Sequence, residues 1–168
     1  MPDGNATKVD VFLSIGSNIA PDENLRMACR ELAASFGDLN LSSVYQNEAV
    51  GFEGDDFLNM VVGFSTVADP GYIFSKLKQL HTQAGREYQD NPFCSRTLDL
   101  DMLLYGDLVR QRLKLPHQDI EKYGFVLRPM VEVAPELRHP VSGKTMSQLW
   151  DGFDAEMYPM QKVDIGIN

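Results

Sequence analysis

Segments typical of strands and segments typical of helices follow one another in a fixed order between residues 11 and 105, and this order restricts the fold more than any other feature. Apolar residues alternate or form short β-rich runs in the first kind, and they recur at helical spacing in the second. The strand-like segments are 11–15, 39–45, 57–66 and 97–105, and the helix-like segments are 22–36 and 70–84. The order strand, helix, strand, strand, helix, strand is that of the split β-α-β duplication in ferredoxin-like folds. We therefore predict an antiparallel or mixed sheet covered by helices.

Both predicted helices carry signals at their ends. Asp22 and Asp69 are suitable N-cap residues, and Gly37 and Gly85 suit the left-handed conformation that ends a helix. Two further stretches show no periodicity, and each is about ten residues long, which is long for a loop in a compact domain. These predicted loops are 47–56 and 86–95.

The chain is less regular after residue 106. We predict a short strand at Leu113–Leu115 and a helix at Phe125–Val133, with Pro129 in its first turn. Residues 151–168 contain few candidates for the core, so we expect a weakly attached C-terminal tail. The length of 168 residues predicts a single domain, 1–168.

The charge balance bears on the partners. The chain has 24 acidic and 15 basic residues, a net charge of −9, which argues against a general affinity for nucleic acid or anionic membranes. We therefore expect small-molecule partners, no nucleic acid and no membrane. Separately from the charge, we expect a monomeric protein. We find no signal peptide or transmembrane pattern, and Cys29 and Cys94 cannot form a disulfide framework, so we expect a cytoplasmic protein.

Asp99 and Asp101 stand two residues apart in the predicted strand 97–105. Because side chains alternate between the faces of a strand, both carboxylates project from one face, about 7 Å apart at Cα. Two such charges repel unless a cation lies between them, and oxygen ligands at this spacing suit Mg²⁺ that also binds phosphate. The alternative is an exposed sheet face with two solvated acids.

Cations stand close to this acidic pair in the sequence. Arg96 precedes it by three residues, and Arg86 opens the loop that leads to it. Because the planar guanidinium matches phosphate oxygens, these arginines favour a polyphosphate ligand, although each of them alone fits an ordinary surface position. His117, which follows Pro116, is suited either to donate to phosphate or to cap a turn.

Asn59 stands between Leu58 and Met60 in an otherwise apolar strand. A buried amide is costly unless it is paired, and its donor and acceptor edges complement a heterocycle with an amide-like ring edge. Stacking faces for such a ring are available from Phe57, Phe93 and Phe125. The alternative is a satisfied core asparagine among core phenylalanines.

Other catalytic motifs are absent from the sequence. Gly143-Lys144-Thr145 is similar to the end of a P-loop, but Arg138 stands where the first glycine belongs. The sequence contains no H-E-x-x-H, no paired C-x-x-C and no G-x-S-x-G, which excludes the zinc proteases, zinc ribbons and serine hydrolases that these motifs mark.

Six short motifs occur in the order and spacing of one enzyme family: Ile15–Asn18, Phe57–Asn59, Gly85–Arg86, Arg96–Asp101, Leu115–His117 and Ala134–Leu137. On these motifs the chain resembles the 6-hydroxymethyl-7,8-dihydropterin pyrophosphokinases of folate biosynthesis over about residues 10 to 150, and the R-T-L-D-L-D motif is the most specific. The resemblance implies a ferredoxin-like three-layer α/β/α sandwich with a mainly antiparallel sheet and two long active-site loops. It also implies transfer of pyrophosphate from MgATP to the pterin hydroxymethyl group, with release of AMP.

The resemblance further implies roles for individual residues. Asp99 and Asp101 would hold two Mg²⁺ ions and would form the catalytic group together with Arg86 and Arg96. The residues expected to contact the pterin are Asn47, Val50, Phe57, Asn59, Phe93 and Phe125. The residues expected to contact ATP are His81, Arg86, Arg96, Met102, Arg112, Lys114 and His117.

Some positions depart from the family pattern. Glu87, Tyr88 and Asp90 stand in the second loop where basic residues are common, and Tyr123 stands where arginine is frequent. We therefore expect weaker binding of ATP by this loop. Two alternatives stay open: a paralogue that binds a pterin or a nucleotide with weak or no pyrophosphokinase activity, and a regulatory ligand-sensing module of the same fold, which would have no need of the acidic pair.

Overall fold

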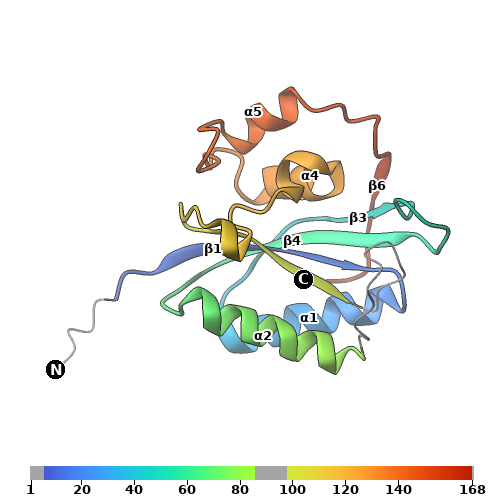
Figure 1. The fold of residues 1–168 in the computed structure, drawn as a ribbon. Coiled ribbons are helices and arrows are strands. Elements are labelled where there is room, and N and C mark those ends of the chain that lie inside the picture. Colours follow the sequence, from blue (N-terminus) through green and yellow to red (C-terminus); the bar gives the residue numbers. More distant parts are fainter. Residues whose placement is uncertain (1–5, 86–97, 168) are drawn as a thin grey trace.

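The computed structural model describes residues 6–85 and 98–167, and Figure 1 shows how their helices and strands are arranged. The strands are β1 (Val9–Ser17), β2 (Asn40–Leu41), β3 (Val44–Asn47), β4 (Phe57–Thr66), β5 (Asp99–Tyr105) and β6 (Met160–Val163). The helices are α1 (Pro21–Phe36), α2 (Pro70–Gln83), α3 (Asp119–Lys122), α4 (Gly124–Val133) and α5 (Met146–Asp151), and a 3-10 helix, η1, spans Gln111–Leu113.

The strands form one six-stranded sheet. Its order is β5-β1-β4-β3-β6, and β2 pairs with β4 beside this path. All the pairings among these strands are antiparallel. The first four strands of this order, β5-β1-β4-β3, correspond to the predicted strands 97–105, 11–15, 57–66 and 39–45. Neighbours in the sheet therefore come alternately from the two halves of the duplication, and the predicted ferredoxin-like fold is confirmed.

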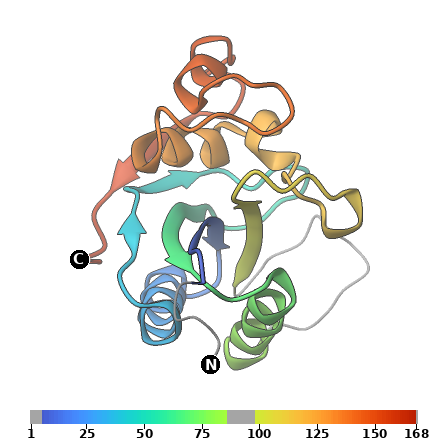
Figure 2. The ribbon, with the colours of Figure 1, turned by 90° about the vertical axis from the view of Figure 1, so that its left-hand side faces the viewer.

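Helices cover both faces of the sheet, as Figures 1 and 2 show, with α1 and α2 on one face and α4 and α5 on the other. The alternation of side chains along each strand accounts for two separate cores. Leu13 and Ile15 of β1 are fully buried in the core that includes α1 and α2, whereas Phe12 belongs to the core that includes α4. The three-layer α/β/α arrangement is therefore confirmed.

The segment 39–45 forms β2 and β3 rather than the single predicted strand. The break lies at Ser42, whose backbone N–H donates to the Val61 carbonyl (2.9 Å) while its hydroxyl oxygen accepts the Val61 N–H (2.8 Å). The Ser42 hydroxyl thus accepts a hydrogen bond that a backbone carbonyl would accept in a continuous strand, so the regular ladder is interrupted.

Two further predictions between residues 106 and 133 are wrong. α4 begins at Gly124, so Pro129 lies inside the helix and not in its first turn. Proline has no N–H to donate to the preceding turn, and the helix accommodates it as a buried residue. The predicted strand Leu113–Leu115 overlaps η1 instead, and the backbone there forms only a single bridge between Arg110 and Leu115.

The predicted N-cap is correct for α2 and wrong for α1. Asp69 caps α2 as predicted, because its carboxylate accepts the Tyr72 N–H (2.8 Å). α1 begins earlier than predicted, with Ala20 at the N-cap and Pro21 as its first residue, so Asp22 lies in the first turn. An acidic residue in the first turn still interacts favourably with the helix dipole.

Residues 151–168 are not the weakly attached tail that we expected. β6 pairs with β3 in the register Val44↔Val163 to Asn47↔Met160, and it becomes an edge strand of the sheet. Beyond it, Ile165 and Ile167 pack against the core on the side of α1, and the Ile165 carbonyl accepts the Arg26 guanidinium (Nε, 3.0 Å). The prediction rested on the scarcity of core residues, but β6 is held by its backbone pairing with β3, and its own residues are exposed or only partly buried.

No helix within residues 6–85 and 98–167 has both the length and the apolar composition needed to cross a bilayer.

Candidate active site

A cavity of about 530 Å³ lies between the sheet and the segment that carries α3 and the start of α4. Side chains of β1, β3, β4 and β5 line it on the sheet side, and residues 114–126 line it on the other. Five of the six predicted pterin contacts line this cavity: Asn47, Val50, Phe57, Asn59 and Phe125. The two predicted metal ligands and two of the predicted ATP contacts line it as well: Asp99, Asp101, Lys114 and His117.

An amide pair marks one end of the cavity. Asn59 Nδ2 donates to Asn47 Oδ1 (2.6 Å), and Asn47 Nδ2 donates in turn to the Glu48 carbonyl (2.9 Å). Among the described residues, nothing donates to Asn59 Oδ1, so this amide retains an acceptor and a second N–H for a ligand. The strand β1 leaves room for it, because a Cβ on Gly16 would lie 2.6 Å from Asn59 Oδ1.

Aromatic rings flank the amide pair. Phe57 packs edge-on against Phe52 of the loop that precedes β4, with ring centroids 6.2 Å apart. Across the cavity, Phe125 stacks on Tyr123 at 4.8 Å with an interplanar angle of 17°. All four rings line the cavity, so a flat heterocycle beside the amides would meet aromatic faces or edges.

The acidic pair lies on β5, at the opposite side of the same cavity. Asp99 pairs with Gly16 and Asp101 with Ser14 of β1, so both carboxylates project from the same face of the sheet as predicted. Their side chains are only partly buried. Two carboxylates that reach a water-accessible cavity are the donor set that Mg²⁺ prefers, so these residues fit that ion.

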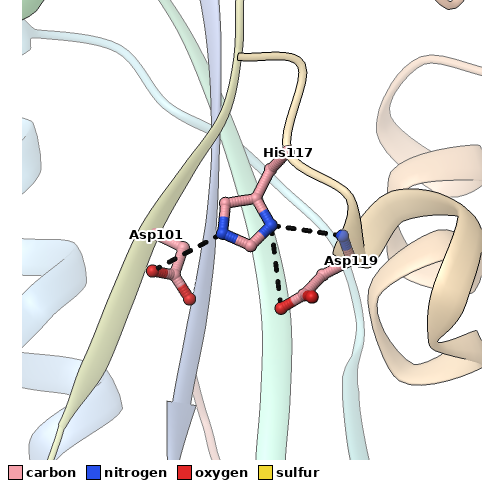
Figure 3. Close-up of side chains that lie close together, drawn as sticks. All are labelled: Asp101, His117 and Asp119. Atoms are coloured by element: carbon pink, nitrogen blue, oxygen red, sulfur yellow. Dashed lines mark hydrogen bonds and ion pairs between the residues drawn. The ribbon is translucent and has the colours of Figure 1, made fainter. Parts of the chain in front are cut away.

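His117 lies between Asp101 and Asp119, as Figure 3 shows. Its Nδ1 accepts the Asp119 N–H (3.2 Å) and lies 3.7 Å from the Asp119 carboxylate, while its Nε2 lies 4.0 Å from Asp101 Oδ1. The loop is fixed by the His117 N–H, which donates to the Leu103 carbonyl of β5 (2.9 Å). The histidine is thus held beside the acidic pair by its backbone as well as by its ring.

The electrostatics of the site favour an uncharged His117 imidazole. Burial lowers the pKa of His117 from its ordinary value, although the Asp119 charge acts in the opposite direction. Burial also raises the pKa of Asp119. Because Nδ1 accepts a backbone N–H, the neutral ring carries its proton on Nε2, and it presents a donor on the side of Asp101.

Three predicted ATP contacts lie outside the lining of this cavity. His81 is buried on the last turn of α2, and its Nε2 accepts the Leu100 N–H (2.9 Å) on the edge strand β5. Met102 is buried in the core that includes α1 and α2, and Arg112 is exposed on η1. Their roles toward ATP stay predictions. The remaining predicted site residues, Arg86, Phe93 and Arg96, lie outside the described residues.

Several residues that line the cavity or lie beside the acidic pair were not among the predicted site residues. Asp119 is one of them, since ligand atoms of Asp101, His117 and Asp119 all lie within 4.8 Å of one another. Its position two residues after His117 was an available signal. Lys122 and the ring of Phe52 were missed for a different reason, because nothing in the local sequence shows that they face the cavity.

Comparison with known proteins identifies the relatives of this chain. The family model described as 7,8-dihydro-6-hydroxymethylpterin-pyrophosphokinase (HPPK) matches residues 12–135. A 2-amino-4-hydroxy-6-hydroxymethyldihydropteridine pyrophosphokinase of Aquifex aeolicus (strain VF5) is 32% identical over 142 residues, which are 82% of this chain and 88% of that protein. The protein of the same name from Synechocystis sp. is 35% identical over 147 residues, 84% of this chain and 75% of that protein.

Solved structures agree at the level of the fold. The crystal structure of Plasmodium falciparum HPPK-DHPS wild type with pterin and p-hydroxybenzoate aligns with a TM-score of 0.71 at 14% identity, over 90% of this chain and 44% of that one. A triple mutant of the same protein with pteroate aligns with a TM-score of 0.70 at 13% identity. The chain spans less than half the length of these structures. From the family match and the curated relatives together, the chain belongs to the 7,8-dihydro-6-hydroxymethylpterin-pyrophosphokinase family.

Proposed function

We propose that this protein transfers the pyrophosphate group of MgATP to 6-hydroxymethyl-7,8-dihydropterin in folate biosynthesis, giving the pterin diphosphate and AMP. Family membership and the names of the relatives support the activity. The single observation that carries it is one cavity lined both by the Asn59–Asn47 amide pair and, across β1, by Asp99 and Asp101 of β5. A pterin and a polyphosphate need these two environments side by side.

The pterin end is suited to a flat ring with donors and acceptors along its edge. Asn59 offers an acceptor and an N–H, and its bond to Asn47 fixes which edge of the amide faces the cavity. Phe57 and Phe125 supply apolar walls for the ring. Because an unpaired amide in a closed site is costly, these contacts also select against rings that lack the complementary edge.

The phosphate end combines carboxylates with cations. We propose that Asp99 and Asp101 hold Mg²⁺, two ions in the complete complex, which would neutralise phosphate charge. Lys114 and Lys122 line the same cavity and supply positive charge from the protein itself. The His117 Nε2–H is placed to donate to a phosphate oxygen.

The reaction then depends on position more than on covalent chemistry. The pterin hydroxymethyl oxygen attacks the β-phosphorus of ATP, the bond between that phosphorus and the oxygen bridging to the α-phosphorus breaks, and AMP leaves with this oxygen. The hydroxyl proton is lost to water or a neighbouring base. Holding both substrates in one cavity makes the attack effectively unimolecular, and the charged side chains stabilise the developing charge.

We also propose that the protein is a monomer and that residues 1–168 form a single domain. The sheet runs from β1 to β6, which supports one domain. Light scattering at assay concentration tests the monomer.

The activity is tested with the purified chain, ATP, Mg²⁺ and 6-hydroxymethyl-7,8-dihydropterin. We expect AMP and the pterin diphosphate in equal amounts, and no AMP when the pterin is omitted. Formation of ADP in place of AMP would overturn the reaction type. Binding of both substrates without AMP formation would favour a paralogue that binds without catalysis.

A further inference from the structure

The segment between α5 and β6 returns to the candidate active site from outside the part of the chain that the family model matches, residues 12–135. The register Asn47↔Met160 places the start of β6 beside the asparagine that bonds Asn59. Tyr158 stands two residues earlier. It lines a neighbouring cavity of about 440 Å³ that shares Asn47 and Val50 with the candidate active site.

Tyr158 completes a cluster of three rings at the wall of the active-site cavity. Its ring meets Phe125 at 5.8 Å with an interplanar angle of 72° and meets Tyr123 at 5.3 Å with an angle of 61°. Phe125 and Tyr123 themselves stack on each other. Tyr158 therefore presents an edge to both members of the stacked pair, which is a favoured geometry for aromatic rings.

The start of α4 is fitted closely to the same C-terminal part of the chain. A Cβ on Gly124 would lie 3.0 Å from Met160 Cε and 3.2 Å from Phe153 Cε1. The backbone that carries Phe125 thus packs directly against residues 153 and 160 on either side of Tyr158. The C-terminal part of the chain therefore contacts both the backbone at Gly124 and the ring of Phe125.

We propose that Tyr158 is a positioning residue for the pterin: it holds the Phe125 ring, with Tyr123, in the orientation that forms the wall of the pterin end of the cavity. The inference rests on the proposed function, in which Phe125 contacts the pterin. Tyr158 acts through Phe125. A ring without this support samples other orientations, and the pterin must then order it on binding.

The expected effect follows from the size of an aromatic edge contact, about 0.5 to 1.5 kcal/mol, or about a two- to tenfold change in affinity. Tyr158→Ala should raise the Kd of 6-hydroxymethyl-7,8-dihydropterin by about that factor. The Kd of a non-hydrolysable ATP analogue with Mg²⁺ should stay within about twofold. Tyr158→Phe keeps the ring and should bind the pterin as the wild type does.

The experiment is calorimetry on the full chain, with the pterin titrated in the presence of Mg²⁺ and the ATP analogue. Tyr72→Ala is the matched control, because Tyr72 of α2 makes an edge contact of the same kind with Phe36 (6.3 Å, 88°) on the other face of the sheet. Tyr72→Ala loses one edge contact and Tyr158→Ala loses two, but only Tyr158→Ala should lose pterin affinity. If Tyr158→Ala does not fold, Tyr158→Leu keeps apolar volume without a ring and is expected to show the same loss.

Unchanged pterin affinity in folded Tyr158→Ala or Tyr158→Leu overturns the role of Tyr158 and leaves the proposed function intact. Equal losses of pterin and nucleotide affinity also overturn it, because they indicate a general structural role. If the wild type binds the pterin but forms no AMP, the proposed reaction is wrong. The pterin Kd of Tyr158→Ala, compared with that of the wild type, still tests the role of Tyr158. A wild type that does not bind the pterin overturns both.

Discussion

The Asn59 side chain lies across the backbone of Gly16, so closely that a Cβ on residue 16 would stand 2.6 Å from Asn59 Oδ1. The two residues face each other in the central strand pair β1–β4. The glycine in the Ile15–Asn18 motif is therefore explained by a lack of space above it. It leaves room for the amide that we assign to the pterin.

Gly16→Ala should displace Asn59 and break its bond to Asn47. We expect the pterin Kd to rise by about tenfold or more, and the free energy of unfolding to fall by about 1 to 3 kcal/mol because of the overpacking. Calorimetry and urea unfolding give the two values. Gly152→Ala is the control, since the nearest atoms to its Cβ lie at 3.9 Å. Retention of wild-type pterin affinity in Gly16→Ala would show that the amide does not need its present position.

Asp99→Asn and Asp101→Asn should each lower the rate of AMP formation by several orders of magnitude. An asparagine keeps the shape of the side chain but removes the charge that holds Mg²⁺, so the fold should be preserved. Single-turnover assays across a range of Mg²⁺ concentrations measure the effect. Asp107→Asn, on the exposed turn after β5, should behave as the wild type. Near-normal rates for both site variants at saturating Mg²⁺ would refute the metal assignment.

Asn59→Leu should weaken pterin binding by about 1 to 3 kcal/mol, because ring-edge donors and acceptors of the ligand then lose their partners. Nucleotide affinity should barely change, since the amide pair and the acidic pair line different ends of the cavity. Separate titrations with each ligand measure this. Loss of nucleotide affinity with unchanged pterin affinity would reverse the two ends of the site.

Glu132→Gln should reduce stability at neutral pH and lose this effect in acid. Burial alone would raise the pKa of Glu132, but hydrogen bonds from Tyr45 and Ser43 outweigh it, so the pKa lies below its ordinary value of 4.5. A lowered pKa in the folded state means that the charged form stabilises the fold above the pKa of the unfolded chain. This contribution is lost as the pH falls through the folded-state value.

The stability difference between the wild type and Glu132→Gln should therefore be constant at neutral pH and shrink below about pH 4.5. Urea unfolding between pH 7 and pH 3 measures it. Glu136→Gln, at an exposed position just beyond α4, is the control. A difference that does not vary with pH would mean that the glutamate acts through its shape and not its charge.

Features encoded in local sequence were predictable. The strand 57–66 and the Asp69 cap depend on neighbouring residues only, and both are found as predicted. The common face of Asp99 and Asp101 followed from the alternation of side chains in any strand. Chemistry that depends on residue type and on strand geometry can be read from a short stretch of chain.

Features that depend on distant partners were not predictable in the same way. The break at Ser42 requires a backbone group of β4, and β6 has a place in the sheet only because β3 offers an edge. Tyr158 reaches the site through that pairing. The strand predicted at 113–115 is wrong for the converse reason. Local contacts decide the structure there, because the chain forms a 3-10 helix and a single bridge between Arg110 and Leu115.

The pairing of β3 with β6 also has a consequence for the order in which the molecule assembles. The elements β1, α1 and β4 are near one another in the sequence, whereas β3 and β6 are separated by most of the chain. Closing the loop between β3 and β6 therefore carries a larger entropic cost. During synthesis, β6 also emerges after every other strand described. The wall of the pterin end should therefore mature last, and pulse-labelled hydrogen exchange should show protection of the β1–β4 amides before those of β3 and β6. Early in folding the protein would possess the part of its core that β1 and β4 form while it still lacks a complete place for the pterin.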